Sequence, residues 1–168
     1  MALSLSKSSG RFSGLMTAVF LLFLSNAQAQ SNITFLVVVR EGLQNGQITM
    51  TYSTVDEGGI DNVFNGQLND WARSAGINPM VVTLQFNYEF TITETSAYSH
   101  YSESGVWSVE SANTFADLNG QTGSYQKLVN LAAYTPYTVV SRPVNATGRV
   151  LRLTMQRQTG DNYVHLSE

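Results

Sequence analysis

The sequence contains no cysteine among its 168 residues. A disulfide framework, a thiol nucleophile and a bacterial lipid anchor after a cleavage site are therefore excluded. Small eukaryotic secreted domains usually carry disulfides, because their compartment permits them and their small cores need them. The absence of cysteine therefore favours a bacterial envelope or surface protein.

The chain also has little charge. Charged residues make up 12% of it, against roughly 25% in ordinary soluble domains. The chain is instead rich in the uncharged polar residues serine, threonine, asparagine and glutamine. Such a composition is typical of surface fibres, adhesins and sugar-binding modules. Without Lys7 and Arg11, which lie in the leader described next, seven basic residues face twelve acidic ones, a net charge of −5. That sign disfavours nucleic acid and anionic membranes as partners.

No apolar run is long enough to span a bilayer. The longest candidate, residues 15–24, follows Lys7 and Arg11 and precedes an Ala27-Gln28-Ala29 cleavage motif. Ten residues fit a signal peptide, whereas a membrane-spanning helix needs roughly 20. The sequence therefore predicts a cleavable signal over 1–29, a single domain over 30–168 and no transmembrane helix. The protein is placed outside the cytoplasm, in the periplasm or at the cell surface.

Motifs for catalysis are missing as well. The sequence has no G-x-S-x-G, H-E-x-x-H or Walker loop. We therefore predict that the protein is not an enzyme and has no cofactor. Asp56, Glu57 and Asp61 gather around a glycine pair, but their spacing does not match a calcium-binding EF-hand loop. A solvated acidic loop is the simpler interpretation, and no metal is predicted.

The first part of the domain predicts a β-hairpin over residues 33–55. Residues 35–39 are a continuous apolar run, and Asn45-Gly46 is a strong hairpin-turn signal. Residues 47–55 then alternate between apolar and polar side chains.

A short helix is predicted next, over about residues 61–74. Asp61 can cap its start, Gly76 can end it, and Gly66 weakens it. Its apolar residues recur at helical spacing: Ile60, Val63, Phe64, Leu68, Trp71 and Ala72.

The rest of the chain predicts β-strands. Residues 80–95 alternate strictly between apolar and polar side chains, so one face of that strand is expected to be buried. Asn119-Gly120 marks a turn. Short strands separated by turn residues indicate an antiparallel β-sandwich of about seven to eight strands with one helix. The remaining strands are expected at 106–109, 125–132, 137–142, 149–157 and 163–166.

The loop over residues 96–104 and the strand after it hold the first candidate binding residues. Tyr98, His100, Tyr101 and Trp107 could stack on sugars or anchor a protein partner. The alternative is that tyrosine and tryptophan are here as ordinary strand residues.

Arginines form a second candidate set. Arg149, Arg152 and Arg157 share one predicted strand and could bind an anionic polysaccharide or an acidic partner, or could instead discourage edge-to-edge pairing. Residues 30–126 carry a net charge of −8 and residues 127–168 a net charge of +3. That asymmetry fits either internal pairing within one domain or head-to-tail self-association.

Together these features predict an exported, non-catalytic β-domain that binds or assembles, such as a fibre or adhesin-type subunit. Protein partners or self-association are expected, and a polysaccharide is possible. The alternative is a periplasmic accessory or chaperone of a fibre-assembly system, which would use residues 35–39 as an exposed edge or a donated strand. A small outer-membrane barrel fits the sequence less well, because residues 60–75 favour a helix and most predicted strands are too short to span a membrane.

Overall fold

The computed structural model describes residues 31–99, 104–158, 160 and 162–167. The chain divides into two compact units, residues 1–31 and 32–168, and the fold below is that of the second. The predicted signal peptide lies outside the described residues. Within the described part, no helix combines the length and the apolar character needed to cross a membrane.

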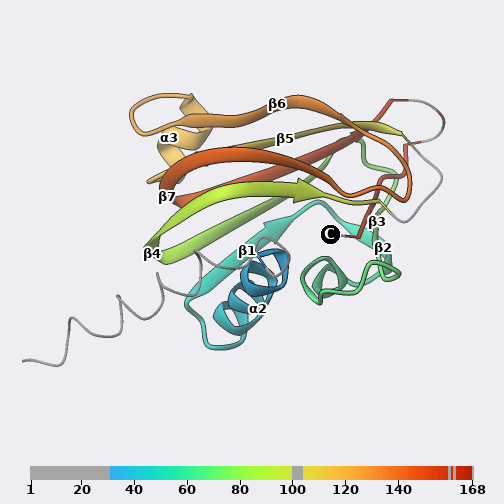
Figure 1. Ribbon diagram of the computed structural model, residues 1–168, viewed down its shortest axis with the longest axis horizontal. Helices are drawn as coiled ribbons and strands as arrows, with labels where there is room; N and C mark the ends of the chain where they lie inside the picture. Colours follow the sequence, from blue (N-terminus) through green and yellow to red (C-terminus); the bar gives the residue numbers. More distant parts are fainter. Residues whose placement is uncertain (1–30, 100–103, 159, 161, 168) are drawn as a thin grey trace, which may run out of the picture. The chain divides into compact units, whose positions relative to one another are not determined.

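The domain is mostly β, and the predicted antiparallel β-sandwich is confirmed (Figure 1). A five-stranded sheet has the order β1-β4-β7-β5-β6, and a smaller sheet has the order β2-β3-β8. All strand pairings among the described residues are antiparallel. The strands are β1 (Ile48–Tyr52), β2 (Val55–Gly58), β3 (Ala72–Ser74), β4 (Met80–Ala97), β5 (Gly105–Ala112), β6 (Gln126–Tyr134), β7 (Val140–Arg157) and β8 (His165–Leu166).

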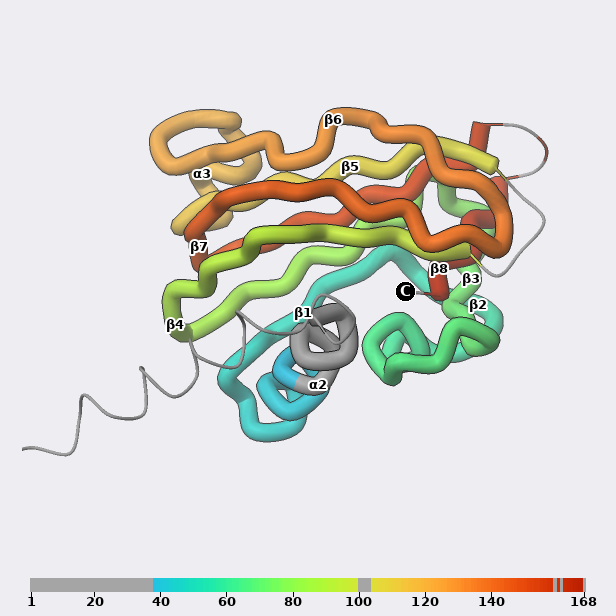
Figure 2. The backbone as a smooth tube through the Cα atoms, viewed as in Figure 1, coloured from blue at the N-terminus to red at the C-terminus, as the bar shows by residue number. Residues whose placement is uncertain are grey.

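Two long strands create the layers of the domain. β4 and β7 both fold back at the same end of the molecule, on the left of Figures 1 and 2. Their pairing register shifts between Gln85 and Phe90, where the bend lies. Gly148 pairs with Phe90, and a Cβ there would stand 2.9 Å from the carbonyl oxygen of Ala112. Glycine therefore lets β7 bend closely past the end of β5.

The core lies where the alternation of β4 predicted it. Val82 and Leu84 on the first half of β4 are fully buried, and Phe90 and Ile92 on its second half join the same core cluster. Because β4 folds back, one strand supplies apolar residues to both layers. The two segments predicted separately at 137–142 and 149–157 are both parts of β7.

The predicted hairpin over 33–55 is wrong, because α2 (Ser31–Gln44) is a helix. Val39 and Leu43 lie one helical turn apart and pack on the core with Ile48. The backbone N–H of Asn45 donates to Glu41 at 3.0 Å, and Gly46 (φ +75°) then reverses the chain, so the Asn-Gly pair ends a helix. β1 pairs with β4 instead. A strand edge or donated strand at 35–39 is thereby overturned.

The predicted helix over 61–74 is also incorrect. A single 3-10 turn, η1 (Ile60–Phe64), buries Ile60, Val63 and Phe64, and the chain then opens. Gly66 has φ +79°, and Asn65 accepts a hydrogen bond from the Gln67 backbone at 2.8 Å, which favours a turn over a helix. A short helix does occur elsewhere, at α3 (Phe115–Gly120), where Thr114 caps the start by accepting from the Asp117 N–H at 3.1 Å.

Candidate functional site

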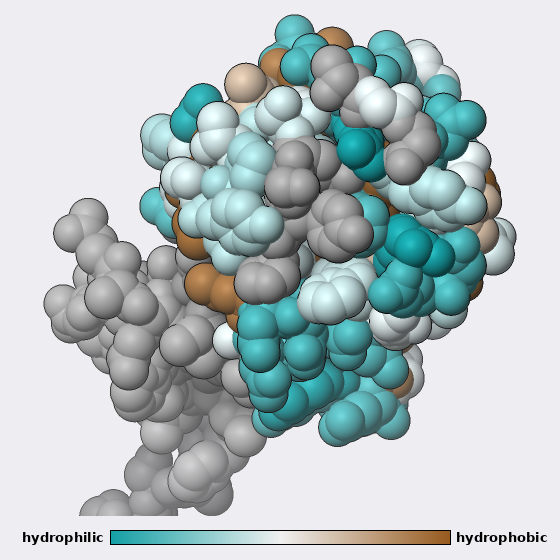
Figure 3. Space-filling model, turned by 90° about the vertical axis from the view of Figure 1, so that its right-hand side faces the viewer, coloured by the Kyte–Doolittle hydropathy of each residue, from teal (hydrophilic) through white to brown (hydrophobic). Residues whose placement is uncertain are grey.

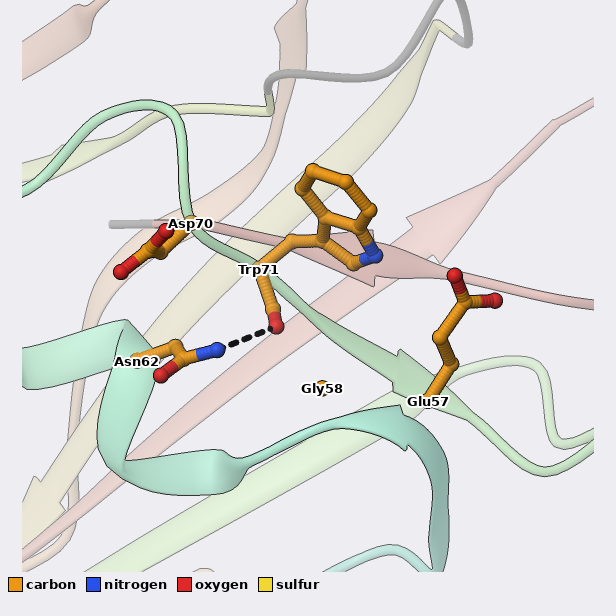
Figure 4. Close-up of a pocket in the computed structure, with 5 residues that line it drawn as sticks. All are labelled: Glu57, Gly58, Asn62, Asp70 and Trp71. Atoms are coloured by element: carbon orange, nitrogen blue, oxygen red, sulfur yellow. Dashed lines mark hydrogen bonds between the residues drawn. The ribbon is translucent and has the colours of Figure 1, made fainter.

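The end of the molecule that carries β2, β3 and η1 contains an open pocket of about 190 Å³. Figure 3 views this end and shows hydrophilic side chains gathered over its lower part, with little apolar surface among them. Figure 4 shows the pocket itself. Its walls come from the end of β2, from η1 and from the segment that enters β3. The lining residues are Glu57, Gly58, Asn62, Asp70 and Trp71.

The backbone of the pocket depends on a glycine. Gly58 has φ +70°, and a Cβ at this position would overlap the carbonyl oxygen of Trp71. The same carbonyl accepts a hydrogen bond from Nδ2 of Asn62 at 3.0 Å (Figure 4). β2 and β3 can therefore approach closely at Gly58. The hydrogen bond from Asn62 links η1 to Trp71.

The Trp71 ring is the apolar part of the pocket. It is half-buried, and it lies between Asp70 on one side and Glu57 on the other (Figure 4). Oδ2 of Asp70 accepts from Nδ2 of Asn65 at 2.9 Å, which holds this carboxylate in place. An aromatic face beside carboxylate and amide oxygens can contact the apolar face of a sugar ring and accept hydrogen bonds from its hydroxyls.

Arg73 holds the acidic wall of the pocket. Its Nε donates to Oδ1 of Asp56 at 2.9 Å, and its Nη1 lies 2.6 Å from Oε2 of Glu57. The hydrogen bond from Arg73 lowers the pKa of Asp56 below its usual value, and the same bond raises the pKa of Arg73. Asp56 and Arg73 therefore both remain charged at neutral pH.

Replacing Asp56 with asparagine is expected to make the unfolding free energy depend less on pH in the acid range. Because the pKa of folded Asp56 is lowered, its ion pair stabilises the fold above the ordinary value of 3.8, and this contribution is lost as the pH falls through the lowered pKa. Urea unfolding from about pH 2 to about pH 6 measures the difference in unfolding free energy between wild type and Asp56→Asn. This difference should become smaller at low pH. At the upper end of this pH range, about 1 M NaCl should also reduce the difference in unfolding free energy, because the ion pair is solvent-exposed. A difference that responds to neither pH nor salt would contradict this assignment.

Two of the four aromatic-loop residues proposed from sequence are buried in the domain. Trp107 is 2% exposed and belongs to the main core, and Tyr98 is buried at the end of β4. Their rings are therefore packed inside the domain, which agrees with the alternative that they are ordinary strand residues. His100 and Tyr101 lie outside the described residues.

The three arginines are not gathered into one site either. Arg149 is exposed, whereas Arg152 pairs with Glu110 at 3.6 Å and donates to Asn119. Arg157 lies at the far end of β7, and its Nη1 donates to the carbonyl of Tyr163 at 3.4 Å. β7 is a central strand between β4 and β5, so these side chains do not protect a sheet edge.

Sequence reasoning missed the residues that line the pocket. Trp71 was placed on the buried stripe of a helix that does not form, and Glu57 was assigned to a solvated loop. The available signal was the Gly58-Gly59 pair and the Asn65-Gly66 turn, followed by the Asp70-Trp71 pair. Among the residues that the structure describes, no three histidine, aspartate or glutamate side chains are placed to hold a metal ion.

Comparison with known proteins identifies the fold. No protein-family model matches the sequence, and no curated protein matches it. Solved structures do match. The carbohydrate-binding module of AlyQ, from family 32 and in complex with 4,5-unsaturated mannuronic acid, is 16% identical, with a TM-score of 0.55 over 71% of this chain and 90% of the module.

Two further structures match to the same degree. A family 32 module from Clostridium perfringens in complex with GalNAc-β-1,3-galactose is 11% identical, with a TM-score of 0.56 over 75% of this chain and 95% of the module. A chitosan-binding module from a Paenibacillus chitosanase/glucanase is 16% identical, with a TM-score of 0.56 over 73% and 92%. The domain therefore has the β-sandwich fold found in family 32 carbohydrate-binding modules.

Proposed function

We propose that this chain is an exported, non-catalytic carbohydrate-binding domain and that the Trp71 pocket is its sugar site. The observation that carries the proposal is the half-buried indole flanked by two carboxylates and an amide in an open pocket. Carbohydrate-binding modules of the same fold support it, as does the abundance of uncharged polar residues. The secretory signal over 1–29 would deliver the domain to a polymer outside the cytoplasm.

The charge of the pocket indicates the class of sugar. Of the five described lining residues two are acidic and none is basic. Carboxylates accept hydrogen bonds from hydroxyl and ammonium groups but repel other carboxylates. The pocket is therefore suited to neutral or amino sugars and opposes uronic acids.

The two acids are placed for binding rather than for glycoside cleavage. Glu57 is held in an ion pair by Arg73, and Asp70 accepts a hydrogen bond from Asn65. A carboxyl group that cleaves a glycoside must be free to contact the scissile bond, whereas both of these carboxylates already have a partner in the domain. Assembly into fibres, the other predicted role, stays a prediction that no observation on the described residues tests.

The proposal can be tested with the intrinsic fluorescence of residues 30–168. The chain has two tryptophans: Trp107 is buried in the core, whereas Trp71 is half-buried at the wall of an open pocket. Acrylamide should therefore quench one emitter readily and the other poorly. A neutral or amino oligosaccharide that binds should protect the accessible emitter and leave the buried one unchanged.

The panel contains neutral gluco- and galacto-oligosaccharides, chitosan oligosaccharides and oligoalginate. Protection by a neutral or amino member with little or none by oligoalginate is the expected result. If no member of the panel protects Trp71, and calorimetry detects no binding, the proposed function is overturned. Preference for oligoalginate would overturn the assigned sugar class.

A further inference from the structure

We propose that Arg73 and Tyr163 are positioning residues that hold Glu57 at the pocket wall and thereby couple segment 162–167 to the sugar site. The inference rests on the proposed function for its effect on binding. The contacts that carry it are seen without any ligand. Neither Arg73 nor Tyr163 lines the pocket, so each would act through Glu57.

The small sheet places these residues in register. Glu57 pairs with Arg73 across β2 and β3, and Arg73 pairs with His165 across β3 and β8. Arg73 is therefore the central side chain of the row. Its guanidinium uses one nitrogen for Asp56 at 2.9 Å and another for Glu57 at 2.6 Å. A planar fork of donors can hold two carboxylates at once, which a lysine ammonium on its flexible stem does less well.

Tyr163 supports the guanidinium from below. Cζ of Arg73 lies 4.8 Å from the centroid of the Tyr163 ring, within the range of a cation–π contact. The next residue, Val164, is fully buried, and its N–H donates to Oγ of Ser74 at 2.9 Å while its carbonyl accepts from the Ser74 N–H at 3.0 Å. The ring therefore stands on a segment that is fixed to β3.

This arrangement orders a side chain that would otherwise move. The Glu57 side chain is 47% exposed, and glutamate loses several rotamers when a ligand fixes it. An ion pair formed before binding removes much of that entropic cost, as any preorganised contact does. The shared arginine also offsets part of the negative charge of Asp56 and Glu57, so the wall presents acceptors without an isolated carboxylate.

The test compares five variants, one of them a double variant, with the same glycan. Arg73→Lys keeps the charge and loses the fork, and Tyr163→Leu keeps apolar bulk and loses the ring face. Each is expected to weaken binding by about three- to tenfold, because one side chain must then be ordered on binding. Tyr163→Phe keeps the ring and should bind like the wild type. In a Glu57→Gln background, Arg73→Lys should have little further effect on affinity, since the two changes act on one contact.

A second measurement needs no sugar. The Arg73 Nε–H is expected to be ordered in the wild type by Asp56 and Tyr163, and its NMR order parameter should fall in Tyr163→Leu and recover in Tyr163→Phe. An unchanged order parameter in Tyr163→Leu would overturn the coupling whether or not a glycan binds. If Trp71→Ala loses binding while Arg73→Lys and Tyr163→Leu keep it, the coupling fails and the proposed function stands. Equal losses from Arg73→Lys in both backgrounds would likewise overturn it.

Discussion

Trp71→Ala is expected to weaken binding of a neutral or amino oligosaccharide by roughly 30-fold. The indole is the apolar surface of the pocket, and covering part of an aromatic ring is worth about 2 kcal/mol, which corresponds to that factor. Because the side chain is half-buried, its removal should also lower the unfolding free energy, so affinity is compared only for protein that remains folded. Isothermal titration calorimetry with the best member of the glycan panel measures the loss, and urea unfolding checks that the fold is retained.

The matched control is Tyr52→Ala. Tyr52 lies on β1, outside the lining of the pocket, and it is 48% exposed. This variant should bind like the wild type, whereas Trp71→Phe should keep part of the affinity because it keeps a ring. Wild-type affinity in Trp71→Ala, or an equal loss in Tyr52→Ala, would show that sugars bind elsewhere or by a less specific contact.

A chain that stops after Asn162 is expected to lose about 3 to 6 kcal/mol of unfolding free energy, from the burial of Val164 and Leu166 alone. Val164 is fully buried and Leu166 is 7% exposed, and both belong to the main core. Most domains have a total stability of only roughly 5 to 15 kcal/mol. The truncation also removes β8 from the small sheet and leaves the buried Ser74 hydroxyl without its Val164 donor.

Urea unfolding followed by circular dichroism measures this loss, with Val139→Ala as the control. Val139 is 45% exposed, so trimming it should change stability by no more than about 0.5 kcal/mol. The truncated chain should also lose sugar binding, because β3 carries Arg73 and follows directly from Trp71. A truncated chain with the wild-type urea midpoint would contradict the role given to this segment.

The sequence determined those elements whose pattern permits one interpretation. Residues 80–95 alternate so regularly that only a strand fits, and the apolar face of β4 is buried on both of its halves, with Thr83 on the other face buried as well. The antiparallel sandwich followed from the number of such segments and the turns between them. The apolar run at 35–39 is different, because a short continuous run fits a strand and a buried helix equally well. This segment is helical because a helix places Val39 and Leu43 on one face, which packs on the main core together with Ile48.

The candidate site was decided by the tertiary structure. Trp71 lines the pocket, half-buried, because η1 ends before Gly66 and because β2 and β3 meet at Gly58. Neither event has a local sequence signal as strong as the helical spacing of the apolar residues in this segment. Glu57, Arg73 and Tyr163 are far apart in sequence and meet only through strand pairing in the small sheet. Local patterns record which face of an element is buried, whereas a site built across β2, β3 and the segment before β8 depends on register between distant residues. The sequence alone thus determined a cysteine-free β-sandwich, and the pairing of three short strands determined where it can hold a ligand.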